Sequence, residues 1–349
     1  MYARLYDFQW IHQENFTIQW YGNTITFPCV LNIPAPYKEN MHFYGPEDPR
    51  ILVEQGIAHA EPVVVFNMIV DVENKTRAMH IHKPFSNITT SLRIMNEERK
   101  DCEKNWSPFF LPRTELWDEV SQVEAKPSEY IHFIYDWQPL KILRCQLSSG
   151  LCIFVYRQDQ SGSAFYPYTE SHDYGEIECR MHGGTNFEPL NIPTVSGLRS
   201  FVGLPRAHTG AGCGKEALYR PILVLLSTNG THFYIDYSSE ALDFGHSILD
   251  PAQLEDVCND GRILLANSIT KISSLDDTMS VSFTVADSTV QVAEVHGVRK
   301  LMEHLPQFHS AEQDLDAIQW KLNVTHDVLA CSLESASDYA IANTNTSEL

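Results

Sequence analysis

Residues 44–53 read YGPEDPRILV, and this stretch joins a cluster of charges to the start of an apolar run. Pro49 lacks a backbone donor and disfavours helix before it, whereas the Ile-Leu-Val that follows favours a strand. We therefore expect Glu47, Asp48 and Arg50 at the entrance of a strand that holds them rigidly in a cleft. Carboxylates there can accept hydrogen bonds from sugar hydroxyls, and an arginine can grip a phosphate with two hydrogen bonds. In isolation the same motif would be a solvated turn with a local ion pair.

Outward from this motif, strand signals dominate the chain. The predicted strands are short, rich in β-branched or aromatic residues, and bounded by Gly, Pro, Asn or Asp. They are residues 24–27, 63–66, 130–135, 222–226, 231–235 and 279–283. Asn229-Gly230 predicts a hairpin turn between two of them. An all-β propeller or sandwich follows from this pattern.

Two further features complete the predicted architecture. Helical periodicity is confined to residues 299–304 and 310–334, so a C-terminal helix is expected. A second hairpin is predicted around residues 148–150, and Cys145 and Cys152 flank its turn almost symmetrically. We expect a cross-strand disulfide between these two cysteines; the other six allow too many pairings for a prediction.

The bulk composition excludes one class of partner and favours one compartment. The chain has 349 residues, with 25 Lys+Arg against 45 Asp+Glu and a formal charge of -20. Most of such a surface repels a phosphate backbone, so nucleic acid is a poor partner. Eight cysteines and seven Asn-x-Ser/Thr sequons favour a lumenal or extracellular protein over a cytosolic one. No run of about 18 apolar residues predicts a membrane span, so a targeting segment is expected to be absent from this sequence.

A glycine-rich segment, residues 201–221, gathers four potential cations in this acidic chain: Arg206, His208, Lys215 and Arg220. Its glycines allow the backbone to approach a ligand closely, which suits a nucleotide diphosphate or a sugar phosphate. Taken alone, the segment would more simply be a surface loop with scattered charges.

Three polar residues outside this segment are also candidates for a site. Asp136 lies between two aromatic residues, an arrangement common where pyranose CH faces stack on rings, although a turn-capping aspartate fits equally. Asp243 has the same ambiguity, with the turn reading favoured. Asn105 belongs to a sequon, yet a buried asparagine that orients a ligand or a loop would carry no glycan.

Several separated segments resemble, in this order, the fungal β-mannosyltransferases of yeast cell-wall mannan. They are residues 44–53, 61–68, 104–110, 133–151, 183–185, 201–221, 238–245 and 281–293. Residues 44–50 and 281–288 also resemble, more distantly, motifs of the five-bladed propeller of β-mannoside phosphorylases. In the second motif Phe283-Thr284 replaces the Tyr-Gly pair of the phosphorylases, so that match is partial. The resemblance implies a five-bladed propeller over residues 1–305, with a first blade that is either complete or truncated, and a helical segment over 306–349.

The resemblance also implies a reaction and its residues. An inverting glycosyltransferase would move mannose from GDP-mannose to mannan or mannosylated glycans and form β-1,2-mannosides. The catalytic candidates are Asp48, Asp287, Glu47 and Asp136, and the general base is not assigned among them. The substrate-binding candidates are Arg50, Asn105, Arg206, His208, Arg220 and Asp243. We expect no metal site and no cofactor besides the donor, and the sequence leaves metal dependence open.

Two other functions remain open at this point. A β-mannoside phosphorylase or hydrolase would use the same EDPR motif with phosphate or water, and a mannan-binding propeller without catalysis is the third possibility. The phosphorylases that the chain resembles carry a catalytic aspartate upstream of the EDPR motif. In this sequence the one aspartate before Glu47 is Asp7, and its surroundings are not distinctive. The resemblance places the protein in the secretory pathway, in the Golgi lumen as a type II membrane protein at full length.

Overall fold

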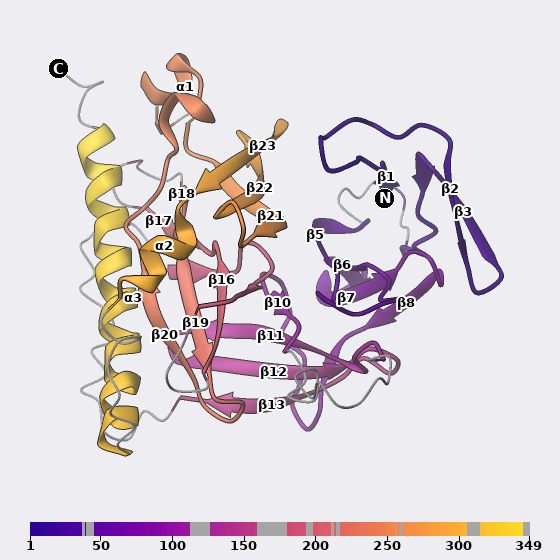
Figure 1. Ribbon diagram of the computed structural model, residues 1–349, viewed down its shortest axis with the longest axis horizontal. Coiled ribbons are helices and arrows are strands. Elements are labelled where there is room, and N and C mark those ends of the chain that lie inside the picture. The colour runs from indigo at the N-terminus through magenta and orange to yellow at the C-terminus, as the bar shows by residue number, and fades with distance from the viewer. Residues whose placement is uncertain are drawn as a thin grey trace. The chain divides into compact units, whose positions relative to one another are not determined.

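The computed structural model describes most of the chain (Figure 1). The described residues are 1–36, 39, 45–111, 126–158, 180–192, 198–210, 213, 217–255, 257–258, 261–305 and 315–344, with residues 315–327 and 344 described as helix only. These residues divide into two compact units. The first contains residues 1–104, 110–132 and 144–153, and the second contains residues 105–109, 133–143 and 154–349.

The first unit is built on a four-stranded antiparallel sheet in the order β5-β6-β7-β8. Its strands are β5 (Glu47–Leu52), β6 (Val63–Asp71), β7 (Thr76–Lys83) and β8 (Ile88–Ser91). β6 carries seven consecutive buried residues, as expected for a central strand covered on both faces. Two small pairs precede it: β1 (Tyr2–Ala3) with β4 (Cys29–Val30), and β2 (Phe16–Trp20) with β3 (Asn23–Phe27).

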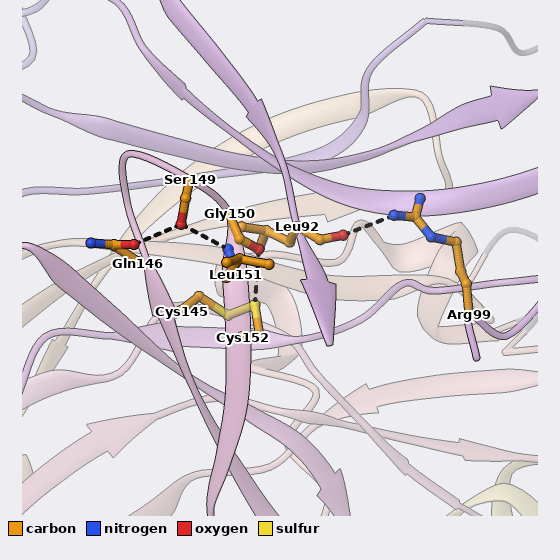
Figure 2. The surroundings of a disulfide bond; sticks show 8 residues. All are labelled: Leu92, Arg99, Cys145, Gln146, Ser149, Gly150, Leu151 and Cys152. Atoms are coloured by element: carbon orange, nitrogen blue, oxygen red, sulfur yellow. Dashed lines mark hydrogen bonds between the residues drawn. A yellow bond between two sulfur atoms is a disulfide. The ribbon is translucent and has the colours of Figure 1, made fainter. Parts of the chain in front are cut away.

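A five-stranded sheet follows in the order β10-β11-β12-β13-β9. Its strands are β9 (Arg93–Ile94), β10 (Ser107–Phe109), β11 (Tyr130–Trp137), β12 (Leu140–Gln146) and β13 (Leu151–Arg157). The turn between β12 and β13 carries the predicted Cys145–Cys152 disulfide, which is confirmed (Figure 2). Gly150 has φ +71° in this turn, and a Cβ there would collide with the carbonyl oxygen of Ser91, so the turn requires glycine.

The second unit contains three more antiparallel sheets. The first contains β14 (Arg180–His182), β17 (Arg206–Thr209) and β18 (Leu218–Pro221). The second contains β15 (Glu188–Leu190), β16 (Arg199–Gly203), β19 (Val224–Thr228) and β20 (Phe233–Ser238). The third contains β21 (Leu264–Ser273), β22 (Thr278–Val285) and β23 (Thr289–His296). Val202, Leu225, Val281 and Phe283 belong to one buried cluster, so the second and third of these sheets share a core. The loop Cys213 is joined to Cys258 by a second disulfide.

Helices are few, as predicted. α1 (Pro251–Glu255) and α2 (Val298–Glu303) are short, and α3 (Leu315–Thr344) runs along β17 and β20 (Figure 1). Leu329, Leu333, Ala336 and Ala340 form a buried stripe at helical spacing. α3 continues ten residues beyond the predicted end at residue 334, because this small-residue stripe extends the packed face. Among the described helices, none has the length and apolar character needed to cross a bilayer.

The observed elements confirm a chain made mostly of β-sheets with few helices. Each of the six predicted strands overlaps an observed one, and the Asn229-Gly230 hairpin joins β19 to β20. The sheets formed by the described residues are open, so the five-bladed propeller stays a prediction. The division into residues 1–305 and 306–349 also stays a prediction; α3 belongs to the same compact unit as the sheets on which it packs.

Candidate functional site

The EDPR motif forms the first part of β5, whereas the sequence predicted a strand only after Pro49. A bulge makes this possible: Glu47 is opposite Asn67 and Arg50 is opposite Val65, so one residue of β6 faces two of β5. Proline is tolerated at such a bulge because no ladder hydrogen bond is required of it. Asp48 absorbs the kink with φ 50°, a left-handed conformation that aspartate accepts more readily than most residues.

Glu47 is held by a residue that the sequence did not single out. Arg77 on β7 donates from Nη1 and Nη2 to the two carboxylate oxygens of Glu47, at 2.7 and 2.8 Å. Asn67 on β6 lies between them: its Oδ1 accepts from Arg77 at 2.8 Å, and its Nδ2 donates to the Glu47 carbonyl at 3.3 Å. Such a fork fixes both charges and the start of the bulge.

Asp48 and Arg50 occupy opposite environments within the same bulge. Arg50 is buried, at 3% exposure, and its Nη1 donates to the Asp48 carbonyl at 3.2 Å. The Asp48 side chain is exposed, and its Oδ2 has a long contact of 3.4 Å with Asn67 Nδ2. Asp48 therefore carries the more exposed of the motif's two carboxylates, on a backbone that Arg50 and Asn67 hold through hydrogen bonds.

In the second unit, the register of β14, β17 and β18 gathers five side chains on one face of their sheet. Arg206 is opposite His182, and His208 is opposite both Arg180 and Tyr219. Directly opposed residues share a face, and residues two apart on β17 share it too. We name this set, Arg180, His182, Arg206, His208 and Tyr219, the Arg206 face.

The rings of the Arg206 face contact one another. His208 stacks on Tyr219 with centroids 4.7 Å apart, and His182 lies edge-on to His208 at 5.3 Å. The Arg206 guanidinium is 5.9 Å from the Tyr219 ring, at the outer limit of a cation–π contact, and its Nη2 donates to Asn105 Oδ1 at 2.7 Å. Two guanidinium groups, two imidazoles and a phenol ring on one face provide donors for an anion and a flat surface for a ring.

Two glycines bring the neighbouring backbone against this face. A Cβ on Gly183 would overlap the carbonyl oxygen of Asn105, and a Cβ on Gly184 would overlap that of Leu204. Asn105 itself has φ 65°. This close approach fixes Asn105 beside Arg206, and its role in orienting a loop or a ligand stays a prediction.

Arg220 lies on the opposite face of the same sheet, because it is opposite Ala207 and side chains alternate along a strand. It is fully buried; Nη1 donates to the Tyr219 carbonyl at 2.8 Å, and Nη2 to the Tyr339 hydroxyl of α3 at 3.4 Å. Tyr339 in turn donates to Asp243 Oδ2 at 3.0 Å. Burial raises the pKa of Tyr339, which keeps the hydroxyl protonated as a donor.

The cations that the sequence grouped in residues 201–221 are therefore separated. Arg206 and His208 remain together on the Arg206 face, whereas Arg220 and Asp243 fasten α3 to the other side. Asp243 also accepts from the Gly245 backbone at 2.8 Å, the turn contact that the sequence favoured. Lys215 lies outside the described residues.

The two remaining carboxylate candidates differ in their surroundings. Asp136 on β11 is half-buried and accepts from Lys141 Nζ at 3.0 Å, so its charge is already paired. Asp287 is exposed in the turn between β22 and β23, with φ 50° after Ala286 at φ 53°. A five-bladed propeller would bring Asp48 and Asp287 to one cleft; Asp287 belongs to the second unit and Asp48 to the first, so this convergence stays a prediction.

Sequence reasoning did not single out Asn67, Arg77, His182, Tyr219 or Tyr339. Asn67 and Tyr219 do fall inside segments that carried the family resemblance, and Tyr219 is flanked by candidate cations. His182 directly precedes the quoted Gly-Gly pair. Arg77 and Tyr339 gave no signal in the sequence, since Glu47 lies 30 residues from Arg77 and Asp243 lies 96 residues from Tyr339.

These features define a β-sheet protein with polar and aromatic surfaces of the kind that suit carbohydrate and phosphate ligands. The model of the family described as "Beta-mannosyltransferases" matches residues 1–83 and 70–339. The chain belongs to the β-mannosyltransferase family.

Individual relatives agree with the family model. The chain is 28% identical over 365 residues to beta-mannosyltransferase 1 of Komagataella phaffii, covering 97% of this chain and 53% of the relative. It is 31% identical over 293 residues to beta-mannosyltransferase 4 of the same organism, covering 81% and 52%. It is 29% identical over 367 residues to beta-mannosyltransferase 3 of Candida albicans, covering 99% of this chain and 60% of the relative. The chain thus spans little more than half the length of these curated relatives.

Among solved structures, a beta-1,2-mannobiose phosphorylase from Listeria innocua in complex with beta-1,2-mannobiose is similar at 15% sequence identity. The match covers 79% of this chain and 63% of that chain with a TM-score of 0.40, a value too low to assign a shared fold.

Proposed function

We propose that this protein transfers mannose from GDP-mannose to mannan or a mannosylated glycan and forms β-1,2-mannosides with inversion at the anomeric carbon. Membership of the β-mannosyltransferase family is the observation that carries this proposal. The Arg206 face supports the choice of a nucleotide diphosphate donor, because it concentrates cationic and imidazole donors in a chain of formal charge -20.

In this proposal Arg206 and His208 donate hydrogen bonds to the diphosphate, and the rings of His208 and Tyr219 accept a flat group by stacking. Asn105 orients Arg206 through its 2.7 Å hydrogen bond. Arg220 and Asp243 act indirectly: they hold α3 against the opposite face and so position the strands that carry Arg206 and His208.

Inversion requires one displacement, in which a carboxylate takes the proton of the acceptor hydroxyl while cations stabilise the departing diphosphate. Asp48 and Asp287 are the foremost candidates, since both side chains are exposed. Glu47 and Asp136 rank behind them because Arg77 and Lys141, respectively, already pair with their carboxylates. Arg50 supports the reacting sugar through the Asp48 backbone that it fastens.

We infer a five-bladed propeller with α3 packed outside, and a Golgi-lumenal location as part of a longer type II membrane protein. The hairpin disulfide Cys145–Cys152 and the Cys213–Cys258 disulfide support an oxidising compartment.

The deciding experiment incubates the purified chain with GDP-mannose and an α-1,2-mannotetraose acceptor and analyses the product by NMR. The expected product is a pentasaccharide, the acceptor extended by one β-linked mannose, with release of GDP. An α-linked product would refute inversion. Phosphorolysis of β-1,2-mannobiose by inorganic phosphate, with no turnover of GDP-mannose, would instead assign the phosphorylase activity, and binding without turnover of either would assign a mannan-binding protein.

A further inference from the structure

A pocket of about 210 Å³ lies within the first unit, apart from the EDPR bulge. Its polar and aromatic lining includes Trp20, Tyr21, Glu54, His59, Glu61 and Lys83. We name it the Trp20 pocket. Glu54 follows the end of β5, whereas Glu47 begins that strand, and a six-residue strand spans roughly 17 Å. The pocket and the bulge are therefore at opposite ends of β5.

Two carboxylates in the pocket, of the buried Glu54 and of Glu61, whose side chain is 9% exposed, are fixed in the same way by serines. The backbone N–H and the hydroxyl of Ser86 donate to the two oxygens of Glu61, at 2.9 and 2.5 Å. The same two groups of Ser128 donate to the two oxygens of Glu54, at 2.6 and 2.5 Å. Each carboxylate oxygen has a second lone pair, so each clamped glutamate can still accept a hydrogen bond from a ligand hydroxyl.

An aromatic hairpin tip forms another wall. Trp20 and Asn23 close a two-residue turn in which Tyr21 and Gly22 have φ 42° and 88°. This tip is fastened to the β7–β8 turn: the Trp20 ring lies 5.3 Å from the Phe85 ring, and Asn23 Nδ2 donates to the Phe85 carbonyl at 3.2 Å. Since Ser86 follows Phe85, the aromatic wall and the Glu61 clamp share one turn.

The pocket also contains a cation in a position that limits the possible ligands. Lys83 Nζ is 3.8 Å from Glu61 Oε1, and its side chain is 28% exposed. A bound cation would meet this ammonium group, and a bound anion would meet two carboxylates. A neutral ligand that both donates and accepts hydrogen bonds and presents an apolar face satisfies every wall of the pocket.

We propose that the Trp20 pocket binds one pyranose ring of the mannan or oligomannoside acceptor, stacked on Trp20 with its hydroxyls on Glu54, Glu61 and Lys83. Pockets for drug-sized ligands measure roughly 300–1,000 Å³, so the volume of about 210 Å³ suits a single small ring. The choice of a mannoside rests on the proposed function. Binding at a second point raises the local concentration of a polymeric acceptor without any change in the reacting centre.

The test labels the whole chain with 5-fluorotryptophan, which gives a fluorine resonance for each of the six tryptophans. The Trp20 resonance is the one missing from a Trp20→Phe variant. α-1,2-Mannotriose is then titrated without any nucleotide sugar, so the result does not depend on transfer. The Trp20 resonance is expected to shift with saturation, and Lys83→Met is expected to raise its Kd by about tenfold, as for the loss of a charged hydrogen-bond donor.

Two controls make the outcome specific. Trp10, which is 44% exposed in the same unit and does not line the pocket, should keep its resonance position throughout. Arg206→Ala should leave the Trp20 titration within about twofold, because the donor contacts are not involved. No Trp20 shift up to about 50 mM saccharide, far above ordinary weak binding, or equal shifts at Trp10 and Trp20, would overturn the proposal. If Trp20 responds while GDP-mannose is not turned over, the pocket stands and the proposed function fails.

Discussion

Arg77 holds Glu47 by two hydrogen bonds of 2.7 and 2.8 Å, across the width of β6, at the point where β5 bulges. The guanidinium also reaches Asn67, so three strands are tied together beside the exposed carboxylate of Asp48. Glu47 is thus held in place by Arg77, and a catalytic role for Glu47 stays a proposal.

We expect Arg77→Ala to lower the free energy of unfolding by about 2–3 kcal/mol, because it leaves a partly buried carboxylate without its partner. Arg77→Lys keeps the charge but loses the fork, so it should recover only part of that loss. Urea denaturation measures the free energy of unfolding of each variant. The series includes Arg77→Ala, Arg77→Lys, Glu47→Gln and the Arg77→Ala/Glu47→Gln double variant. Strictly additive losses would show that the two side chains do not interact.

Arg206→Ala should weaken GDP-mannose binding by about 1.5–3 kcal/mol, the usual contribution of a hydrogen bond to a charged group. Mannobiose binding should be largely intact, since the diphosphate is the ligand group concerned. Isothermal calorimetry with both ligands gives the comparison. Equal losses for the two ligands would mean that Arg206 acts only through the structure of the sheet.

The matched control for that experiment is Arg220→Met, on the other face of the same strands. Arg220 is fully buried, so its removal should lower the melting temperature and should not selectively weaken GDP-mannose binding. A selective loss of GDP-mannose affinity in a variant of unchanged stability would contradict the separation of the two faces.

Asp48→Asn and Asp287→Asn remove a charge with almost no change in shape. If either residue accepts the proton of the acceptor hydroxyl, turnover of GDP-mannose should fall about 10²-fold or more. Both side chains are exposed, so thermal stability should change little. Full activity in both variants, measured as transfer to an oligomannoside, would move the chemistry to Asp136 or Glu47.

Tyr339→Phe deletes only the hydroxyl that links Arg220 to Asp243. The aromatic ring still lies 5.0 Å from the Arg220 guanidinium, so packing is retained. We expect a loss of about 1.5–3 kcal/mol in unfolding free energy, since both partners are charged. Unchanged stability would show that the hydroxyl is not needed to hold α3.

Stability should decrease in mild acid because of a histidine on β7. Burial lowers the pKa of His80 from 6.5 to about 4. The unfolded chain therefore takes up this proton at a higher pH than the folded chain does. The contribution of His80 to the free energy of unfolding is therefore complete above about pH 6.5 and is lost as the pH falls towards 4. It amounts to about 3 kcal/mol at most.

The ring of His80 stacks on Phe66, so His80→Phe preserves the shape of the site while removing the titration. Chemical denaturation of this variant between pH 4 and pH 7 should show a shallower dependence on pH. His82, whose pKa burial also lowers, should account for part of the slope that remains. An unchanged slope would locate the acid sensitivity elsewhere.

The sequence predicted those parts of the structure that depend on neighbours along the chain. The Asn229-Gly230 turn and the Cys145–Cys152 hairpin are confirmed, because turn chemistry and short spacing determine them locally. Which face of a sheet a side chain occupies depends on register across strands, and this placed Arg220 away from Arg206. Arg77 could not be assigned to Glu47 for the same reason: β6 lies between them, and only the folded sheet brings them together.

The alternation along β17 has one more consequence. A slip of one residue would exchange Arg206 and His208 with Ala207 and Thr209, and would turn the Arg206 face towards α3. The fit of α3, through Thr209–Ser337 and Arg220–Tyr339, therefore discriminates between correct and shifted pairing. The geometry of the Arg206 face therefore depends on a buried helix interface on the other side of the sheet, so a substitution in that interface can disturb the face without contacting it.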